Sequence, residues 1–274
     1  MNTKDILSPR TVSLYDEVPF WSAAFGQELL NHIPFGRRLK ILDVGCGTGF
    51  PTIEIAERAC RSCKVYGLDP WEAAIERAQA KEKAWNISNL EFRVGRAEAM
   101  PYKDKFFDLV VSNNGLNNTQ DPLQALKECY RVSKPGSTLL FTANMPETMH
   151  EFYSVFRAVL TEMKKKKELN ALDEHIHEKR MSMLEWESLL NLADFRLSGL
   201  WENDFKYRVS NATTLLEHHF IRLAFLPHWH NIIKKKADRD LIFGEIETRL
   251  NDVAVKNHGL TMSVPLACFE ARKL

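Results

Sequence analysis

Three glycines at alternating positions mark the segment of this sequence with the clearest capacity for chemistry. Gly45, Gly47 and Gly49 follow the apolar run Ile41-Leu42-Asp43-Val44 and precede a predicted helix. Glycine lets the backbone turn sharply and approach a ligand closely. In an open parallel sheet, ligands bind beyond the carboxyl ends of the strands, where this loop would lie. The segment is therefore interpreted as a ligand-binding loop, with a tight structural turn as the alternative.

The spacing of these glycines narrows the choice of ligand. A dinucleotide-binding loop needs G-x-G-x-x-G, but Phe50 stands at the third glycine position counted from Gly45. A phosphate-binding loop needs Gly-Lys followed by Ser or Thr, which the sequence lacks. Asp69 ends the predicted strand Val65-Tyr66-Gly67-Leu68-Asp69, where nucleotide-binding sheets hold ribose hydroxyls. Pro70 and Trp71 follow it and could cover the face of an adenine ring.

Five segments carry a family resemblance: ILDVGCGTG, VYGLD, GRAEAMPY, FDLVVSN and RVSKPGSTLLF. In this order and spacing, over residues 36–146, the sequence resembles the class I S-adenosylmethionine-dependent methyltransferases. The resemblance implies an α/β fold with a doubly wound, mostly parallel, seven-stranded Rossmann-like sheet, an antiparallel last strand and helical lid insertions. It also implies S-adenosylmethionine as the cofactor and S-adenosylhomocysteine as the product.

The resemblance also implies a set of cofactor-binding residues. Backbone atoms of the loop would contact the methionine part, Asp69 would bind both ribose hydroxyls, and Asn113 would lie below the sulfonium. The whole implied set is Tyr15, Asp43, Gly45, Cys46, Gly47, Thr48, Gly49, Asp69, Pro70, Trp71, Ala97, Glu98 and Asn113. Many family members have Asp where this chain has Arg96, so Glu98 is the alternative contact for the adenine amino group.

Catalytic and metal-binding residues are harder to assign. A histidine titrates near neutrality and could accept a proton, so His218 and His219 are candidates, although both could simply border the core. His228-x-His230 and His175-x-His177 lack a paired third ligand, and we predict no metal site. Cys60 and Cys63 form a single C-x-x-C and are interpreted as ordinary thiols.

Composition limits the partners. Lys plus Arg number 37 and Asp plus Glu number 36, a balance that disfavours nucleic acid. The lysine runs 164–167 and 234–236 are interpreted as solvated helix faces. The sequence contains no apolar run long enough to span a membrane, and its first residues do not resemble a signal peptide. We therefore predict a cytoplasmic protein without a membrane partner. The sequence does not indicate an oligomeric state.

Strands alternate with helices between residues 39 and 144, which predicts a parallel sheet. The predicted strands are 39–44, 64–69, 90–96, 106–113, 137–144, 195–209 and 260–271. Trp71, Ala74, Ile75 and Ala78 share one face of a helix. We predict one domain with four parts: an N-terminal helical cover (1–35), a cofactor-binding core (36–146), a helical segment with the last core helix (147–194), and the final strand pair (195–274) with a helical insert (211–257).

The sequence leaves three functions open. The first is methylation of a small molecule in an enclosed pocket, because the segment 213–233 is rich in aromatic and aliphatic residues. The second is methylation of a tRNA or a protein, which would need an open cleft and a charged surface. The third is a cofactor-binding module without turnover.

Overall fold

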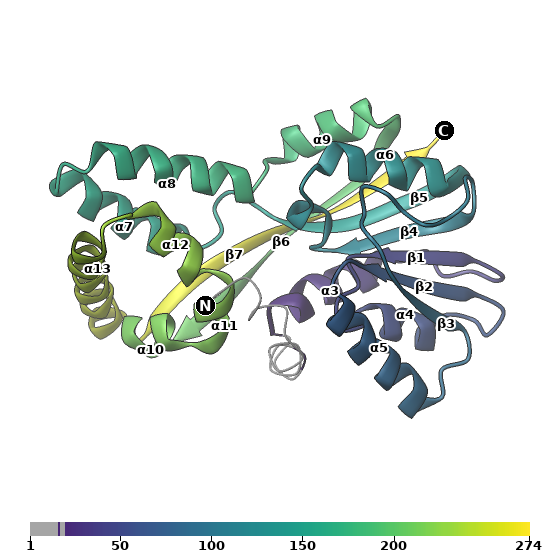
Figure 1. The fold of residues 1–274 in the computed structure, drawn as a ribbon, viewed down its shortest axis with the longest axis horizontal. Coiled ribbons are helices and arrows are strands. Elements are labelled where there is room, and N and C mark those ends of the chain that lie inside the picture. Colours follow the sequence, from purple (N-terminus) through teal and green to yellow (C-terminus); the bar gives the residue numbers. More distant parts are fainter. Residues whose placement is uncertain (1–15, 17–19) are drawn as a thin grey trace. The chain divides into compact units, whose positions relative to one another are not determined.

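The computed structural model describes Asp16 and residues 20–274, which divide into two compact units (Figure 1). The sheet unit comprises the described residues up to Asn144 together with 181–203 and 266–274. The helical unit comprises residues 145–180 and 204–265. Two long strands pass from one unit into the other. The division of the chain into four parts of one domain stays a prediction.

The sheet has seven strands in the order β3-β2-β1-β4-β5-β7-β6. Strands β1 to β5 pair in parallel, whereas β7 runs antiparallel to β5. The predicted fold class is therefore confirmed. The strands are β1 (Lys40–Val44), β2 (Lys64–Asp69), β3 (Leu90–Val94), β4 (Phe107–Asn113), β5 (Ser133–Asn144), β6 (Phe195–Val209) and β7 (Leu260–Lys273).

The predicted strand ends lie within two residues of these bounds except at β5, which begins four residues before the predicted Ser137. Ser133 pairs with Phe107, and the register then shifts so that Thr138 pairs with Leu109. The Lys134-Pro135-Gly136 segment, whose proline and glycine are typical of residues that end a helix, forms the intervening irregularity, and Gly136 has a φ of +75°. A helix stop signal and a strand bulge thus occupy the same residues.

Helices cover both faces of the sheet (Figure 1). Helices α3, α4 and α5 lie on one face, and α6 and α9 lie on the other. The direction in which successive strands are added to the sheet reverses between β1 and β4. Because the crossover connections are right-handed, the helices before and after this reversal lie on opposite faces of the sheet. The bounds are α3 (Phe20–His32), α4 (Thr52–Arg58), α5 (Glu72–Trp85), α6 (Pro122–Val132) and α9 (Met183–Leu192), with a 3₁₀ turn η1 (Leu116–Asn118).

Local sequence explains where several helices begin. The Asp121 side chain accepts a hydrogen bond from the backbone nitrogen of Gln124, and Pro122 occupies the first helical position of α6. Ser182 and Glu185 form a reciprocal capping box at the start of α9. In α5, Ala74, Ile75 and Ala78 are buried, as the helical spacing predicts. These caps fix the residues at which α6 and α9 begin.

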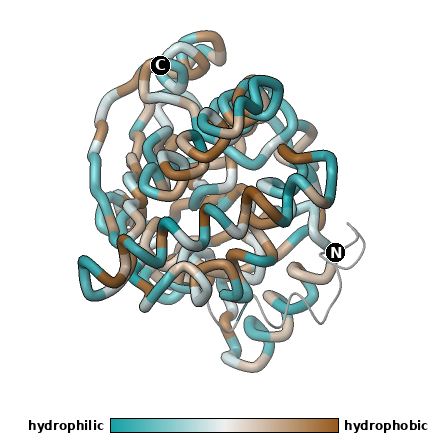
Figure 2. Tube along the Cα trace, turned by 90° about the vertical axis from the view of Figure 1, so that its left-hand side faces the viewer, coloured by the Kyte–Doolittle hydropathy of each residue, from teal (hydrophilic) through white to brown (hydrophobic). Residues whose placement is uncertain are grey.

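The helical unit contains α7 (His150–Glu162), α8 (Lys166–Lys179), α10 (Ala212–Glu217), α11 (His219–Ala224), α12 (Leu226–Ile232) and α13 (Lys236–Asn257). Along the helical turns that face the viewer in Figure 2, hydrophilic and hydrophobic residues alternate. Phe152 stacks on Trp229 with ring centroids 4.0 Å apart, and Phe156 meets Phe243 edge to face. Aromatic packing between α7, α12 and α13 therefore forms the core of this unit.

Among the described helices, none is long and apolar enough to cross a membrane. The cytoplasmic location stays a prediction. In the lysine runs, the side chains of Lys164, Lys166 and Lys167 are exposed, as are those of residues 234–236. The interpretation of both runs as solvated faces agrees with this exposure.

Candidate functional site

The glycine loop leaves β1 and is held against the end of β2. The backbone nitrogens of Gly45 and Cys46 both donate to the carbonyl oxygen of Leu68, at 2.8 and 3.2 Å. Gly45 has a φ of +80° and Gly47 a φ of +51°, a region that favours glycine. A Cβ built on Gly47 would meet no atom within 4 Å, so the backbone here faces open space. The main chain at Gly47 is thus open, and the contact of this loop with a ligand stays a prediction.

The side chain of Cys46 is turned away from open solvent, and its thiol donates a long hydrogen bond to the carbonyl oxygen of Gly47 at 3.9 Å. Its side chain is 1% exposed, and a Cβ on Gly67 of β2 would lie 2.9 Å from its sulfur, so the thiol packs towards the sheet. Burial raises the pKa of the Cys46 thiol. The backbone role implied by the resemblance therefore fits the geometry, and a thiolate role does not.

Asp69 ends β2 with its carboxylate turned towards the glycine loop. Its Oδ2 accepts a hydrogen bond from the backbone nitrogen of Gly47 at 2.9 Å, and its Oδ1 accepts one from the backbone nitrogen of Trp71 at 2.9 Å. Burial raises the pKa of Asp69, and the two backbone hydrogen bonds oppose that rise. A carboxylate can accept about four hydrogen bonds. Two acceptor positions therefore remain for a pair of hydroxyls.

The residues after Asp69 form the start of α5. Pro70 is exposed, and Trp71 is partly buried at the cap position of the helix. Trp71 adopts an extended backbone, which brings its nitrogen back to Asp69. The adenine-flanking role of both residues stays a prediction.

A second acidic side chain, Asp43 of β1, lies fully buried beneath the loop. Its Oδ2 accepts a hydrogen bond from Thr52 Oγ1 at 2.6 Å, while its Oδ1 has no hydrogen-bond partner among the described residues. Burial raises the pKa of Asp43 to about 7, the Thr52 hydrogen bond lowers it, and the nearby charge of Asp69 raises it further. Asp43 is thus a buried carboxyl group whose pKa is raised to near neutrality.

Glu98 and Arg96 form a paired unit after β3. Arg96 Nε lies 3.5 Å from Glu98 Oε2, and Arg96 Nη2 donates to Gln120 Oε1 at 2.8 Å. Glu98 Oε1 accepts a hydrogen bond from the backbone nitrogen of Gln120. Burial raises the pKa of Glu98, but its backbone hydrogen bonds and Arg96 together hold that pKa below the ordinary value. Arg96, where relatives have Asp, therefore supports the Glu98 carboxylate in its charged form.

Asn113 ends β4 and its side chain is already engaged. Its Nδ2 donates to the carbonyl oxygen of Ser22 in α3 at 3.0 Å, and its Oδ1 accepts from Thr142 Oγ1 at 3.1 Å. The side chain thus links α3 to β4 and β5. A position below the sulfonium stays a prediction for Asn113, with the linking role as the observed one.

Asp16 was missed by the sequence analysis. Its side chain is 8% exposed and pairs with Lys81 Nζ at 2.5 Å and Arg77 Nε at 2.7 Å, both on α5. It also hydrogen bonds with the side chain of Thr48 in the glycine loop. Burial raises the pKa of Asp16, and these three partners lower it below the ordinary value. The neighbouring Tyr15, a predicted cofactor contact, lies outside the described residues.

The histidines proposed for catalysis belong to the helical unit. The rings of His218 and His219 stack at 4.8 Å, and Tyr207 meets His218 edge to face. Burial lowers the pKa of His218, and the charge of His219 lowers it further. This packing agrees with the structural alternative, and a catalytic role for either stays a prediction. No group of three metal-binding side chains occurs in the part of the chain that the structure describes.

The cysteines of the C-x-x-C segment are both free. Cys60 is exposed, whereas Cys63 is buried and donates to the carbonyl oxygen of Gly36 at 3.2 Å. One cavity of about 540 Å³ lies between α5 and β3 and is lined by Gln79, Glu82, Lys83, Asn86, Ile87, Leu90, Glu91 and Phe92. None of these residues belongs to the predicted cofactor site, so the enclosed acceptor pocket stays a prediction.

Comparison with known proteins agrees with this geometry. A family described as a methyltransferase domain matches residues 36–212. A demethylmenaquinone methyltransferase of Lactococcus lactis is 41% identical over 119 residues, which are 43% of this chain and 46% of that protein. A malonyl-[acyl-carrier protein] O-methyltransferase of Coxiella burnetii is 36% identical over 144 residues, 52% of this chain and 47% of that protein. The chain thus spans about half the length of these curated relatives.

A solved structure adds support for the fold. An S-adenosylmethionine-dependent methyltransferase from Aquifex aeolicus superimposes with a TM-score of 0.54 at 19% identity. The superposition covers 70% of this chain and 91% of the Aquifex chain. At this identity the likeness concerns the fold alone.

Proposed function

The chain belongs to the methyltransferase domain family, within the class I S-adenosylmethionine-dependent methyltransferases, and from this premise we propose that it methylates a small-molecule acceptor. The observation that carries the proposal is the Asp69 carboxylate at the end of β2. One of its acceptor positions holds Gly47 of the glycine loop, a second holds Trp71 at the start of α5, and two are kept for the ribose hydroxyls of the cofactor.

The residues of the sheet unit fit S-adenosylmethionine in three further ways. The open space at Gly47 leaves room for the methionine part against bare backbone. Glu98 is kept charged by Arg96 and can accept a hydrogen bond from an adenine amino group. The unpaired Oδ1 of Asp43 lies below the loop that would hold the cofactor.

When bound, the cofactor supplies an electrophilic methyl group on a sulfonium. The chain's own contribution is to hold that methyl group in line with the acceptor atom. Alignment of this kind can account for about 7–11 kcal/mol of a barrier. The Gly47–Asp69 hydrogen bond and the Asp16–Thr48 contact fix the loop for this purpose. Removal of water from the acceptor would add to the rate.

Three observations favour a small acceptor. The net formal charge is +1, so the chain has no basic excess for a nucleic-acid backbone. In the helical unit, the segment 213–233 contributes the buried apolar side chains of Leu215, Phe220, Ile221, Trp229, Ile232 and Ile233. The names of the two sequence relatives include a quinone precursor and a carrier-linked malonyl group. We propose an acceptor of this general size with an apolar part.

The first test is thermal unfolding with and without S-adenosylhomocysteine. A ligand at about 100 times its dissociation constant stabilises the protein that it binds by about 2.7 kcal/mol. We expect a rise in the unfolding midpoint of several degrees. Protein shown by mass spectrometry to be free of co-purified cofactor must be used. No rise in the midpoint would overturn the proposal.

The second test is transfer itself. The protein is incubated with methyl-labelled S-adenosylmethionine and, separately, with quinone precursors, small carboxylic acids, bulk tRNA and cell protein. Label in a small molecule supports the proposal, whereas label in tRNA or protein favours the second function left open by the sequence. Cofactor binding without label in any acceptor favours a binding module.

A further inference from the structure

Arg180, at the end of α8 in the helical unit, is a buried arginine without a counter-charge. Its side chain is 3% exposed, and it makes no ion pair with the described residues. Nη2 donates to the hydroxyl of Tyr153 at 3.1 Å, and the guanidinium lies over the Tyr153 ring at 4.9 Å. Nε and Nη1 are buried without any hydrogen-bond partner. A buried charge of this kind is costly unless something pairs with it.

Tyr153 cannot satisfy the remaining hydrogens of Arg180. Its oxygen already accepts a second hydrogen bond, from Trp229 Nε1 at 2.8 Å. Arginine and tryptophan are donors only, so both acceptor positions of the oxygen are occupied. The hydroxyl hydrogen of Tyr153 is then directed to His175 Nε2, 3.3 Å away. The tyrosine is therefore fully used and fixed in place.

The geometry of a guanidinium leaves a matched pair of donors. Its five N–H groups form two forks, each of which can bind both oxygens of a carboxylate. Tyr153 occupies a single hydrogen of Nη2, which belongs to only one of these forks. The other fork stays complete, next to an interior in which Phe152 and Trp229 are fully buried.

We propose that Arg180 binds the carboxylate of a small organic acid. One negative charge balances the one positive charge in apolar surroundings, whereas a phosphate dianion would leave an uncompensated charge. This carboxylate site lies within the helical unit and goes beyond the methyl transfer proposed above. Nothing in the cofactor site requires Arg180, so the two proposals can fail separately.

The experiment measures the unfolding midpoint with three probes: benzoate, its neutral counterpart benzamide, and inorganic phosphate. We expect benzoate to raise the midpoint of the unmodified protein and benzamide and phosphate to leave it unchanged. No rise with benzoate, an equal rise with benzamide, or a rise with phosphate alone would each overturn the proposal.

Two substitutions at Arg180 separate charge from geometry. Arg180→Gln removes the charge and is expected to abolish the benzoate shift, while the ligand-free midpoint stays equal or rises because a buried unpaired charge is gone. Arg180→Lys keeps a charge but lacks the fork, and is expected to need at least about tenfold more benzoate for half of the shift. Persistence of the full benzoate shift in Arg180→Gln would overturn the proposal.

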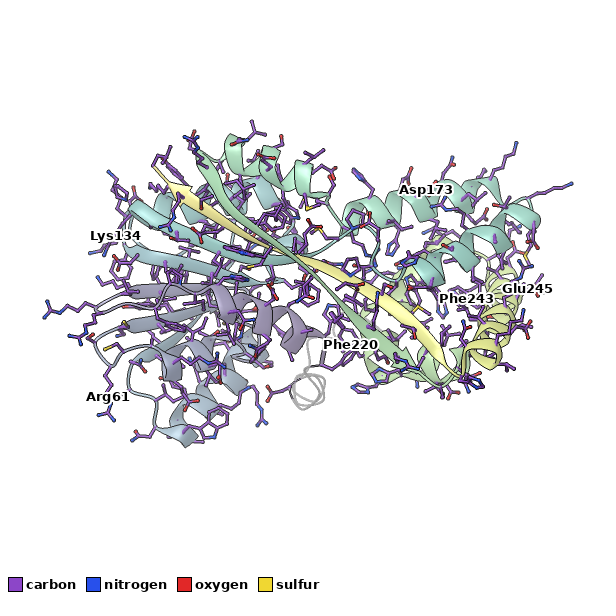
Figure 3. All side chains as sticks on the ribbon, turned by 180° about the vertical axis from the view of Figure 1, so that it is seen from behind. Arg61, Lys134, Asp173, Phe220, Phe243 and Glu245 are labelled. Carbon is purple, nitrogen blue, oxygen red and sulfur yellow. The ribbon has the colours of Figure 1, made fainter. Side chains whose placement is uncertain are left out.

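A matched control lies in the same unit. Arg157 of α7 is half-exposed and pairs with Asp173 of α8, which projects from the helical unit (Figure 3). Arg157→Gln is expected to keep the benzoate shift. The S-adenosylhomocysteine shift is measured in parallel on every variant. If the S-adenosylhomocysteine shift is present and benzoate gives no shift, the carboxylate proposal is wrong and the methyltransferase proposal stands. If the S-adenosylhomocysteine shift is absent from every variant and from the unmodified protein, the methyltransferase proposal fails by itself.

Discussion

The backbone nitrogen of Gly47 donates a hydrogen bond to Oδ2 of Asp69 across 2.9 Å. This contact joins the glycine loop after β1 to the carboxyl end of β2. The same carboxylate that is proposed to bind ribose therefore also shapes the loop that is proposed to bind methionine. Any change at Asp69 is therefore expected to act on both halves of the proposed cofactor site.

Asp69→Asn tests this double role. The amide offers one acceptor oxygen in place of two and turns its NH₂ group towards a backbone donor. A hydrogen bond to a charged group contributes about 1.5–3 kcal/mol, and about 1.4 kcal/mol corresponds to a factor of ten in affinity. We expect the affinity for S-adenosylhomocysteine to fall at least about tenfold, as measured by calorimetry.

Asp108→Asn is the matched control for this change. Asp108 of β4 accepts hydrogen bonds from the backbone of Lys40 and from Lys134, at the opposite ends of the strands. Its substitution is expected to leave cofactor affinity unchanged. Equal losses of affinity in the two variants would show that Asp69 acts only through general stability.

Gly47→Ala separates backbone strain from occupied space. Both Gly47 and Gly136 have a positive φ, and a Cβ on either would meet nothing within 4 Å. An alanine at either position costs about 1 kcal/mol of backbone strain. Only at Gly47 would the methyl group enter the space proposed for the cofactor. We expect similar losses of stability in Gly47→Ala and Gly136→Ala but a loss of S-adenosylhomocysteine binding only in Gly47→Ala. Binding retained in Gly47→Ala would place the cofactor elsewhere.

Much of the sheet unit could be predicted from the sequence because its signals are local. The apolar runs that end at Val44 and Asp69 mark strands by themselves, and the glycines between them require a loop. Asp121 followed by Pro122 similarly marks a helix start without reference to the rest of the chain.

The parts that could not be predicted depend on contacts between distant segments. Arg96 seemed only a departure from the family pattern, because its partner Gln120 lies on a different segment. Arg180 ends a polar, lysine-rich stretch, and its burial depends on Tyr153 and Trp229 from other helices. Neither pairing leaves a periodic signal in the sequence.

Asp16 is expected to act as an anchor between α5 and the glycine loop. Asp16→Asn removes the charge that Lys81 and Arg77 share and weakens the contact with Thr48. Since the pKa of Asp16 is lowered, the stability that it contributes is present above its ordinary pKa and is lost as the pH falls through the lowered value. We expect a loss of about 1 kcal/mol at neutral pH, measured by denaturant unfolding.

The control for Asp16 is Asp104→Asn, which removes an exposed carboxylate paired with Arg131. Exposed ion pairs contribute about 0–1 kcal/mol, so a smaller loss is expected there. If Asp16→Asn also weakens S-adenosylhomocysteine binding, the anchor serves the cofactor site. A loss of stability in Asp16→Asn no larger than that in Asp104→Asn would show that the ion pairs of Asp16 contribute no more than an exposed surface ion pair.

Asp43 is expected to make stability depend on pH in the opposite direction. Its pKa is raised to about 7 by burial, whereas the unfolded chain has the ordinary value of 3.8. Between these two values the unfolded state releases a proton that the folded state keeps, so the free energy of unfolding falls as the pH rises. Above about pH 7 both states are ionised and the contribution of Asp43 becomes constant.

Asp43→Asn removes this proton while keeping an oxygen that can accept the Thr52 hydrogen bond. As the pH rises from about 4 to about 7, the free energy of unfolding is therefore expected to fall less in the variant than in the unmodified protein. Denaturant unfolding at several pH values measures the difference between the two curves. Asp173→Asn, an exposed carboxylate, should follow the unmodified protein across this range. Parallel curves for Asp43→Asn and the unmodified protein would mean that Asp43 is ionised in the folded state throughout, with its charge stabilised by more than the Thr52 hydroxyl.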